Sequence, residues 1–219
     1  MASAPTTYDY PMLVRDELTD LSTLLSELTD EQWDAPSLCE GWRVRDVVGH
    51  ACTGYAYSLP KVLGLTARNG FSISKAANNV AIEYASSRTP AELRTAFAEV
   101  TAPEKPKGFV KTIPWRNRYV DHLIHEQDIR RPLGISRDFP PDRLRAALDA
   151  LPAIGGLLNS KARVKGLRLV ATDIDHAVGT GPEVRGPAEA IVLAASGRTV
   201  TLPELSGDGA AILTARITA

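Results

Sequence analysis

The sequence has few cysteines and almost no charge imbalance. Two cysteines, Cys39 and Cys52, among 219 residues are too few for a disulfide framework, which favours a reducing compartment. The 25 basic and 26 acidic residues give a net charge of −1. Such a balance provides no general attraction to nucleic acid or to an anionic membrane, so we expect neither as a partner.

Long apolar runs are also absent. The longest, such as AIVLAAS at residues 190–196, are far shorter than the roughly 20 residues that cross a bilayer. Residues 1–20 lack the basic and then apolar profile of a signal peptide. Together with 44% apolar and 23% charged residues, which is an ordinary globular composition, these absences predict a cytoplasmic protein.

Helical periodicity dominates the sequence as far as residue 161. One predicted helix opens with Thr89 as N-cap, Pro90 in the first turn and Glu92 at the capping-box position. Apolar residues at helical spacing predict helices over residues 11–28, 44–65, 72–87, 89–102, 115–129 and 140–161.

The pattern changes beyond Ala162. LRLVATDIDHAVGTG runs in rough alternation and predicts strands, GPAEAIVLAASGR predicts a helix that starts at a proline, and LSGDGAAILTARI predicts a short strand or helix. We therefore expect a helical domain over residues 1–162 and a small mixed domain over residues 163–219, too short for a large core of its own.

A polar cluster, DHLIHEQD at residues 121–128, stands out within the helix predicted over residues 115–129. At about 100° per residue, Asp121, His125 and Asp128 project in nearly one direction, whereas His122 points about 100° away. The flanking positions Val120 and Ile124 are aliphatic, so this polar stripe borders the core.

The cluster has two interpretations on spacing alone. A metal site typically takes three protein ligands, and His50 in a neighbouring apolar helix would complete a set with Asp121 and His125. The alternative is a solvated helix face, with His50 a hydrogen-bonded core histidine.

Three segments resemble one known family. WDAPSLCEGWRVRDVVGHA at residues 33–51, RYVDHLIHEQDIRRPLG at 118–134 and the tail GLRLVATDIDHAVGTGPEVRGPAEAIVLAASGR at 166–198 are similar, in the same order, to the mycothiol-dependent maleylpyruvate isomerase family. The resemblance implies a mainly α fold, in which a DinB-like metal-binding four-helix bundle is followed by a small α+β domain of sterol-carrier-like topology.

The resemblance also implies a ligand set. Carried over to this chain, a divalent ion, usually zinc, is held by His50, Asp121 and His125. The family more often has glutamate where Asp121 stands, so this shorter ligand either brings its helix closer to the metal or acts through water. From its place on the same face, Asp128 would accept the second ring N–H of His125 and fix its tautomer, or would be an exposed aspartate near the end of the helix.

Other polar residues near these motifs have less definite roles. Arg118 would pair with Asp121, contact an anionic substrate or lie on the surface, and Arg198 and Arg216 would reach carboxylates of a thiol or substrate. We interpret Cys39 as packed against Trp42 and not as a ligand.

The resulting hypothesis is an enzyme that activates the low-molecular-weight thiol mycothiol at a metal ion, as a cis–trans isomerase or a thiol S-transferase. A binding protein for a small molecule or thiol conjugate and a metal-dependent hydrolase are the alternatives. The expected partners are a small-molecule substrate and the thiol, and the sequence leaves open whether the protein is a monomer or a dimer.

Overall fold

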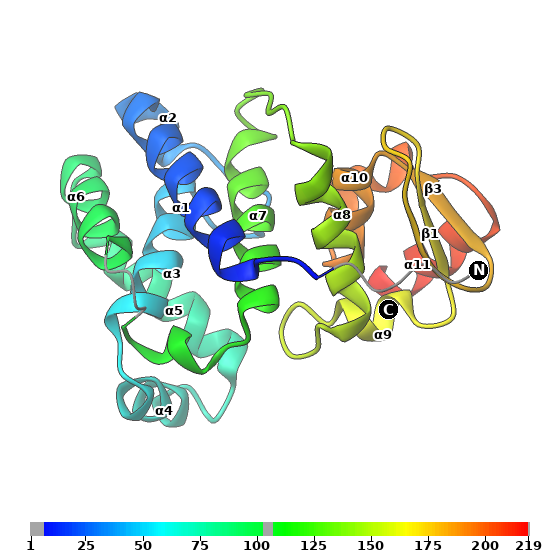
Figure 1. Cartoon of the computed structure of the whole chain (residues 1–219). Coiled ribbons are helices and arrows are strands. Elements are labelled where there is room, and N and C mark those ends of the chain that lie inside the picture. Colours follow the sequence, from blue (N-terminus) through cyan, green and yellow to red (C-terminus); the bar gives the residue numbers. More distant parts are fainter. Residues whose placement is uncertain (1–6, 103–106, 219) are drawn as a thin grey trace. The chain divides into compact units, whose positions relative to one another are not determined.

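The computed structural model describes residues 7–102 and 107–218. It is mainly helical, with one small sheet near the C-terminus, and this confirms the predicted fold class (Figure 1). The helices are α1 (Tyr10–Glu27), α2 (Asp30–Asp34), α3 (Val44–Ala56), α4 (Leu59–Arg68), α5 (Ile73–Ser86), α6 (Pro90–Thr101), α7 (Trp115–Arg130), α8 (Pro141–Ala150), α9 (Ser160–Val164), α10 (Ala188–Ala195) and α11 (Asp208–Thr218), with 3-10 turns at Phe109–Thr112, Leu151–Ala153 and Thr199–Glu204. The strands are β1 (Arg168–Ala171), β2 (Ala177–Gly179) and β3 (Glu183–Gly186).

The chain divides into two compact units, and each is described by itself. Among the described residues, unit 1 contains the segment that ends at Asp16, residues 115–120 and residues 138–218, and unit 2 contains residues 17–102, 107–114 and 121–137. Helix α7 therefore begins in unit 1 and continues in unit 2. The two predicted domains, residues 1–162 and residues 163–219, are continuous stretches of the sequence, and they stay a prediction.

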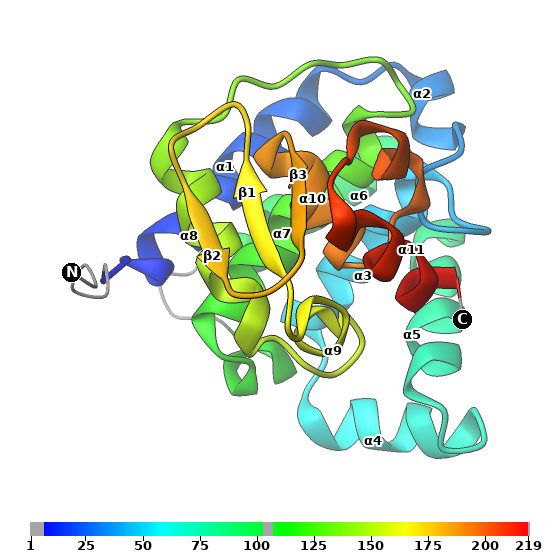
Figure 2. The same cartoon turned by 90° about the vertical axis from the view of Figure 1, so that its right-hand side faces the viewer.

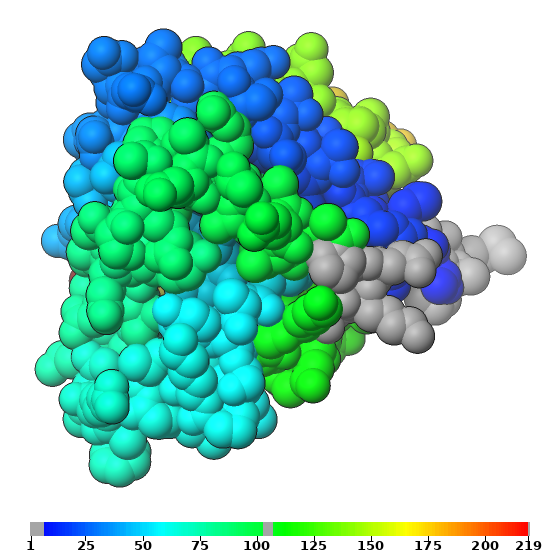
Figure 3. Space-filling view, turned by 90° about the vertical axis from the view of Figure 1, so that its left-hand side faces the viewer, coloured from blue at the N-terminus to red at the C-terminus, as the bar shows by residue number. Residues whose placement is uncertain are grey.

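Unit 2 is a helical assembly in which α3 packs closely against α5 and α6. Figure 3 shows this unit from the side of α6. A Cβ atom at Gly49 would lie 2.6 Å from the Ala81 carbonyl oxygen and 3.1 Å from the Ala85 Cβ, so α3 and α5 approach closely only because these residues are small. This contact fixes the part of α3 that carries His50.

The helix predicted over residues 44–65 is wrong in one respect, because it is two helices. The chain leaves helical geometry at Tyr57 (φ −93°, ψ 131°) and resumes as α4 after Ser58. Pro60 explains the break, since its nitrogen has no hydrogen to donate to a preceding turn of a continuous helix. The capping box at Thr89 is confirmed, with Thr89 N–H donating to Glu92 Oε2 at 2.8 Å.

Unit 1 contains the sheet, whose strands lie in the order β2, β1, β3 (Figure 2). β1 pairs with β2 antiparallel and with β3 parallel, and Leu169 lies opposite both Val178 and Val184. Every residue of helix α10 except Glu189 is buried, so this helix belongs to the core of the unit. The last predicted element is a helix, α11, and not a strand.

The helix predicted over residues 140–161 is also shorter than expected. α8 ends at Ala150, a 3-10 turn containing Pro152 follows, and helical structure returns only at Ser160 in α9. Gly155 and Gly156 lie in the intervening loop, and Gly156 has a φ of +68°, a conformation that glycine adopts without strain. Within the described residues, no helix combines the length and apolarity needed to cross a bilayer.

Candidate metal centre

Helix α7 brings three of the predicted site residues to one side of unit 2, where α3 supplies the fourth. One donor atom from each of His50, Asp121 and His125 lies within 4.8 Å of the other two. His125 Nε2 is 3.6 Å from Asp121 Oδ1, and the rings of His50 and His125 meet at 5.0 Å with an interplanar angle of 66°. Ligand atoms about 2.1 Å from a tetrahedral ion lie about 3.4 Å apart, so this spacing fits a divalent ion after small side-chain movements.

The second ring nitrogen of His125 is hydrogen-bonded on the other side. Asp128 Oδ2 lies 2.9 Å from His125 Nδ1, and Asp128 is fully buried. Because an ionised carboxylate only accepts hydrogen bonds, this contact places the proton of the neutral imidazole on Nδ1, and in that form the Nε2 lone pair faces His50 and Asp121. That is the tautomer that a metal ligand needs.

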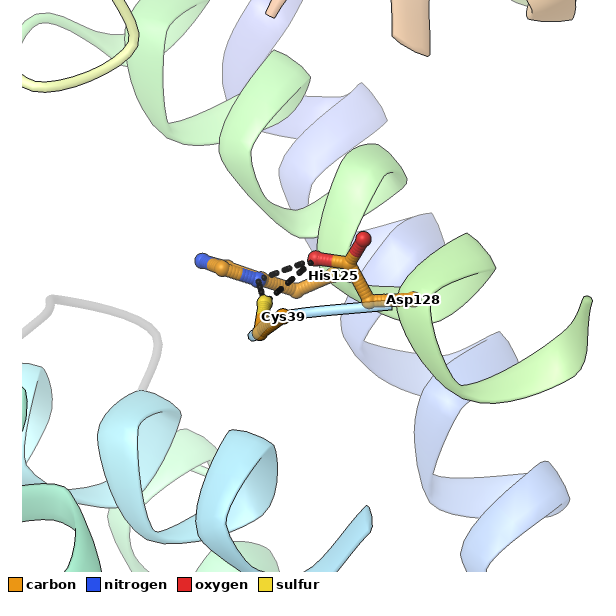
Figure 4. A group of neighbouring side chains, drawn as sticks. All are labelled: Cys39, His125 and Asp128. Atoms are coloured by element: carbon orange, nitrogen blue, oxygen red, sulfur yellow. Dashed lines mark hydrogen bonds and ion pairs between the residues drawn. The ribbon is translucent and has the colours of Figure 1, made fainter. Parts of the chain in front are cut away.

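Cys39 contacts the same carboxylate (Figure 4). Its thiol donates to Asp128 Oδ2 at 3.1 Å, and its sulfur lies 4.0 Å from His125 Nδ1. Cys39, His125 and Asp128 thus form a second group with metal-ligand spacing, which shares His125 with the first. We name His50, Asp121, His125, Asp128 and Cys39 together the histidine cluster.

The carboxylates decide the protonation of His125. Burial lowers the pKa of His125, but the charge of Asp121 and the hydrogen bonds of the ring with Asp128 and Cys39 outweigh it, so the pKa lies well above its ordinary value. An ion that binds Nε2 must therefore displace a proton.

Trp42 packs against both imidazoles. Its ring lies 5.3 Å from the His50 ring and 6.4 Å from the His125 ring, which it stacks upon at 25°. The indole Nε1–H donates to Asn78 Oδ1 at 2.6 Å, which fixes the ring plane. Trp42 therefore restricts the rotation of two candidate ligands from one side.

His122 belongs to another contact. It is buried, its Nε2 lies 2.9 Å from the Tyr55 hydroxyl, and the two rings stack at 25°. The structure thus places His122 away from the histidine cluster and against α3.

The opposite side of α7 carries a second polar cluster, which the sequence did not predict. Arg137 donates to Glu17 Oε2 at 2.8 Å and to Glu126 Oε2 at 2.9 Å, and Arg130 donates to Glu126 Oε1 at 2.6 Å. Arg137 also reaches Asp20 Oδ2 at 2.7 Å. We name Glu17, Asp20, Glu126, Arg130 and Arg137 the arginine cluster.

This second cluster holds three carboxylates against two guanidinium groups. Glu17 and Glu126 have no exposed surface. Burial raises the pKa of Glu126 to about 7; Arg137 opposes the shift and Glu17 adds to it. Because the cluster has one carboxylate more than it has guanidinium groups, a proton on Glu126 is favoured, which agrees with its raised pKa.

The three arginines proposed to contact substrate occupy different environments in unit 1. Arg118 is only 3% exposed and its guanidinium lies 3.7 Å above the Trp115 ring, so the alternative of a surface arginine is wrong. Arg198 Nη1 donates to the Ser196 carbonyl at 3.2 Å, and Arg216 Nη1 donates to the carbonyls of Arg163 and Lys165 at 2.6 and 2.8 Å.

The loop before α3 explains how Cys39 reaches the cluster. Ser37 N–H donates to the Trp42 carbonyl at 2.9 Å, closing a turn that contains Gly41 at φ +74°. Leu38 N–H donates to the Asp128 carbonyl at 3.0 Å, which anchors this turn to α7. The Gly41-Trp42 pair was the available signal for a tight turn, but no sequence signal showed that the turn meets α7.

Helical architecture with two histidines and a carboxylate brought together defines a helix-bundle protein with a candidate divalent-metal centre. The chain belongs to the family described as mycothiol maleylpyruvate isomerase N-terminal domain, whose pattern matches residues 14–130. That range contains every residue of the histidine cluster.

Two solved structures have a similar fold. One is a crystal structure of the mycothiol-dependent maleylpyruvate isomerase, 19% identical with a TM-score of 0.59. The other is a variant of that enzyme in which a histidine is replaced by alanine, 20% identical with a TM-score of 0.58. Each comparison covers 91% of this chain and 92% of the other. None of the curated proteins matches this sequence.

Proposed function

We propose that His50, Asp121 and His125 bind a divalent metal ion and that the protein uses it to activate a low-molecular-weight thiol. The carrying observation is that the three donor atoms lie within 4.8 Å of one another. Family membership supports mycothiol as the thiol and an unsaturated acid resembling maleylpyruvate as the substrate class. A divalent ion such as zinc supplies Lewis acidity, which lowers the pKa of a thiol that it binds.

The residues of the chain prepare this site. Asp128 holds a proton on His125 Nδ1, so that Nε2 is the ring nitrogen that binds the ion in exchange for its own proton. Trp42 keeps both imidazole rings in place. Zinc accepts nitrogen and carboxylate donors of this kind, although other divalent ions also bind mixed sets.

In the proposed isomerisation, the thiol sulfur adds to one carbon of an activated cis double bond, and the electron pair moves to the conjugated carbonyl. Rotation about the resulting single bond and departure of the same thiol return the trans isomer and the free thiol. The alternative outcome, displacement of a leaving group, would give an S-transferase. Arg118, Arg198 and Arg216 remain candidates for contacts with anionic groups of the substrate or thiol. The proposal also includes a catalytic bundle over residues 1–162 and a separate domain over residues 163–219.

The first experiment is metal analysis of the purified protein by mass spectrometry. We expect close to one divalent ion per chain in the wild type and loss of it in His50→Ala and in His125→Ala. His122→Gln is the matched control, because His122 lies on the same helix but contacts Tyr55, and it should keep the metal.

Cys39→Ser separates the two possible ligand groups. Both groups contain His125, but only one contains His50 and only the other contains Cys39. Metal retained in Cys39→Ser and lost in His50→Ala supports the proposed set, whereas the reverse result would move the ion to Cys39 and Asp128.

Turnover then distinguishes the reaction classes. An isomerase or S-transferase requires the added thiol, a hydrolase turns over without it, and a binding protein binds without turnover. Absence of metal in the wild type, with no uptake on addition of zinc, would refute the metal proposal and favour the binding protein.

A further inference from the structure

Helix α4 exposes an unusual amount of apolar surface for a helix of a globular protein. None of its ten residues is buried, although the sequence LPKVLGLTAR is largely apolar. Figures 1 and 2 both show α4 beyond one end of α5. We name the exposed side chains of this helix, of the turn after it and of the first turn of α5 the α4 patch: Leu59, Leu63, Phe71 and Ile73, with Lys61, Arg68 and Lys75.

The four apolar side chains of the α4 patch all have large exposed fractions. Leu59 is 43% exposed, Leu63 61%, Ile73 60% and Phe71 82%. Single exposed apolar residues are normal, but a group of four along fifteen residues marks an interaction surface.

Main-chain contacts hold Phe71 in its exposed position. Its N–H donates to the Thr66 carbonyl at 2.9 Å, and Gly70 N–H donates to the Ala67 carbonyl at 3.2 Å. Phe71 has a φ of +60°, a region that bulky side chains rarely adopt. The turn thus holds a large aromatic ring in solvent in a disfavoured backbone conformation, and the described residues bury little of that ring.

The charged residues of this stretch of the chain have one sign. Between Asp46 and Glu83 the sequence contains no aspartate or glutamate, whereas Lys61, Arg68 and Lys75 are all exposed. A symmetric contact with a second copy would bring these cations together without carboxylates from the patch to neutralise them. An anionic surface has the complementary charge.

We propose that the α4 patch adsorbs to the surface of an anionic lipid bilayer. Phe71, Leu63 and Ile73 would enter the boundary between headgroups and acyl chains, and the cations would contact lipid phosphates. The net charge of −1 averages over the chain and conceals this local surplus of three cations. The proposal concerns adsorption at the surface, independent of the metal centre.

The test uses the full chain and vesicle sedimentation. We expect the wild type to pellet with vesicles of equal parts phosphatidylglycerol and phosphatidylcholine and to stay in solution with phosphatidylcholine alone. Binding should weaken on addition of salt, because screening shortens the range of the attraction to about 10 Å at 0.1 M.

Variants separate the apolar and the charged contributions. Leu63→Ser with Phe71→Ser should weaken binding to the anionic vesicles at least about tenfold. Arg68→Gln should weaken it about fivefold, as expected for one cation near an anionic membrane. The matched control is Leu157→Ser with Val200→Ser, which removes apolar side chains that are 61% and 49% exposed in unit 1 and should leave binding unchanged.

Three results would overturn the proposal. The first is no sedimentation with the anionic vesicles, and the second is equal sedimentation with neutral ones. The third is a wild-type dimer in analytical ultracentrifugation that becomes a monomer in the Leu63→Ser, Phe71→Ser variant, which would assign the patch to a second copy. Circular dichroism of each variant confirms that a loss of binding does not reflect unfolding.

Discussion

The two polar clusters of α7 use similar carboxylates with different partners. In the arginine cluster, Glu126 and Glu17 accept hydrogen bonds from guanidinium groups that stay charged at any physiological pH. In the histidine cluster, Asp128 and Asp121 face an imidazole and a thiol, groups that can themselves bind a metal. The kind of partner, and not the number of acidic residues, therefore distinguishes a structural cluster from a candidate metal centre.

The largest effect should follow from removal of Arg137. Arg137→Ala leaves Glu17 and Glu126 buried without their main cation, and we expect a loss of about 3–5 kcal/mol in the free energy of unfolding. The measurement is urea denaturation, with Arg145→Ala as control, because Arg145 pairs with the exposed Asp142 and should cost less than about 1 kcal/mol. Equal effects of the two variants would mean that the arginine cluster does not stabilise the fold.

The pH dependence of stability should report the surplus carboxylate of the arginine cluster. Because the pKa of Glu126 is raised from 4.5 to about 7, the folded protein binds a proton more tightly than the unfolded chain. The contribution of Glu126 to the free energy of unfolding should therefore fall by roughly 2–3 kcal/mol as the pH rises from 4.5 to 7 and stay low above that.

Glu126→Gln should remove this slope. The measurement compares the free energy of unfolding of the wild type and of Glu126→Gln across this pH range, with the same excess of zinc. His125 titrates in both proteins, so the difference between the two curves isolates the titration of Glu126. Parallel curves would show that the pKa of Glu126 in the folded protein is not raised above its value in the unfolded chain.

The sequence predicted most of the histidine cluster but not the arginine cluster. The common direction of Asp121, His125 and Asp128 follows from helical periodicity alone, and the capping box at Thr89 follows from residues three apart. Arg137, by contrast, meets Glu17 across 120 positions, and no local pattern marks such a pair.

The same limit applies to Cys39 and to α4. Cys39 lies 89 positions before Asp128, so its contact depends on how the turn before α3 docks on α7. The break at Tyr57 was missed because the apolar spacing continues through Ser58 and Pro60 into α4, and only the proline marked the interruption. Local periodicity thus predicts the elements and faces, while tertiary packing decides which side chains meet.

In the histidine cluster, Asp128→Asn should affect the metal more than the fold. The asparagine side chain is neutral, and its amide can donate where the carboxylate only accepts, so the tautomer of His125 is no longer fixed. We expect zinc affinity to fall about 10–100-fold, as is usual for a residue that orients a ligand. Competition with a chromophoric chelator measures this change, and an unchanged affinity would show that Asp128 does not control His125.

The smallest expected effect tests whether the histidine cluster is positioned by stacking or by a hydrogen bond. Trp42→Phe keeps an aromatic ring beside His50 and His125 but loses the indole N–H that donates to Asn78. We expect a loss of about 1 kcal/mol in the free energy of unfolding and little change in zinc affinity, because the ring still restricts both imidazoles. Trp42→Ala is the contrasting variant, and it should also reduce zinc affinity. If both variants bind zinc like the wild type, the imidazoles are held by Asp128 and the helices alone, and the stacking on Trp42 serves the core.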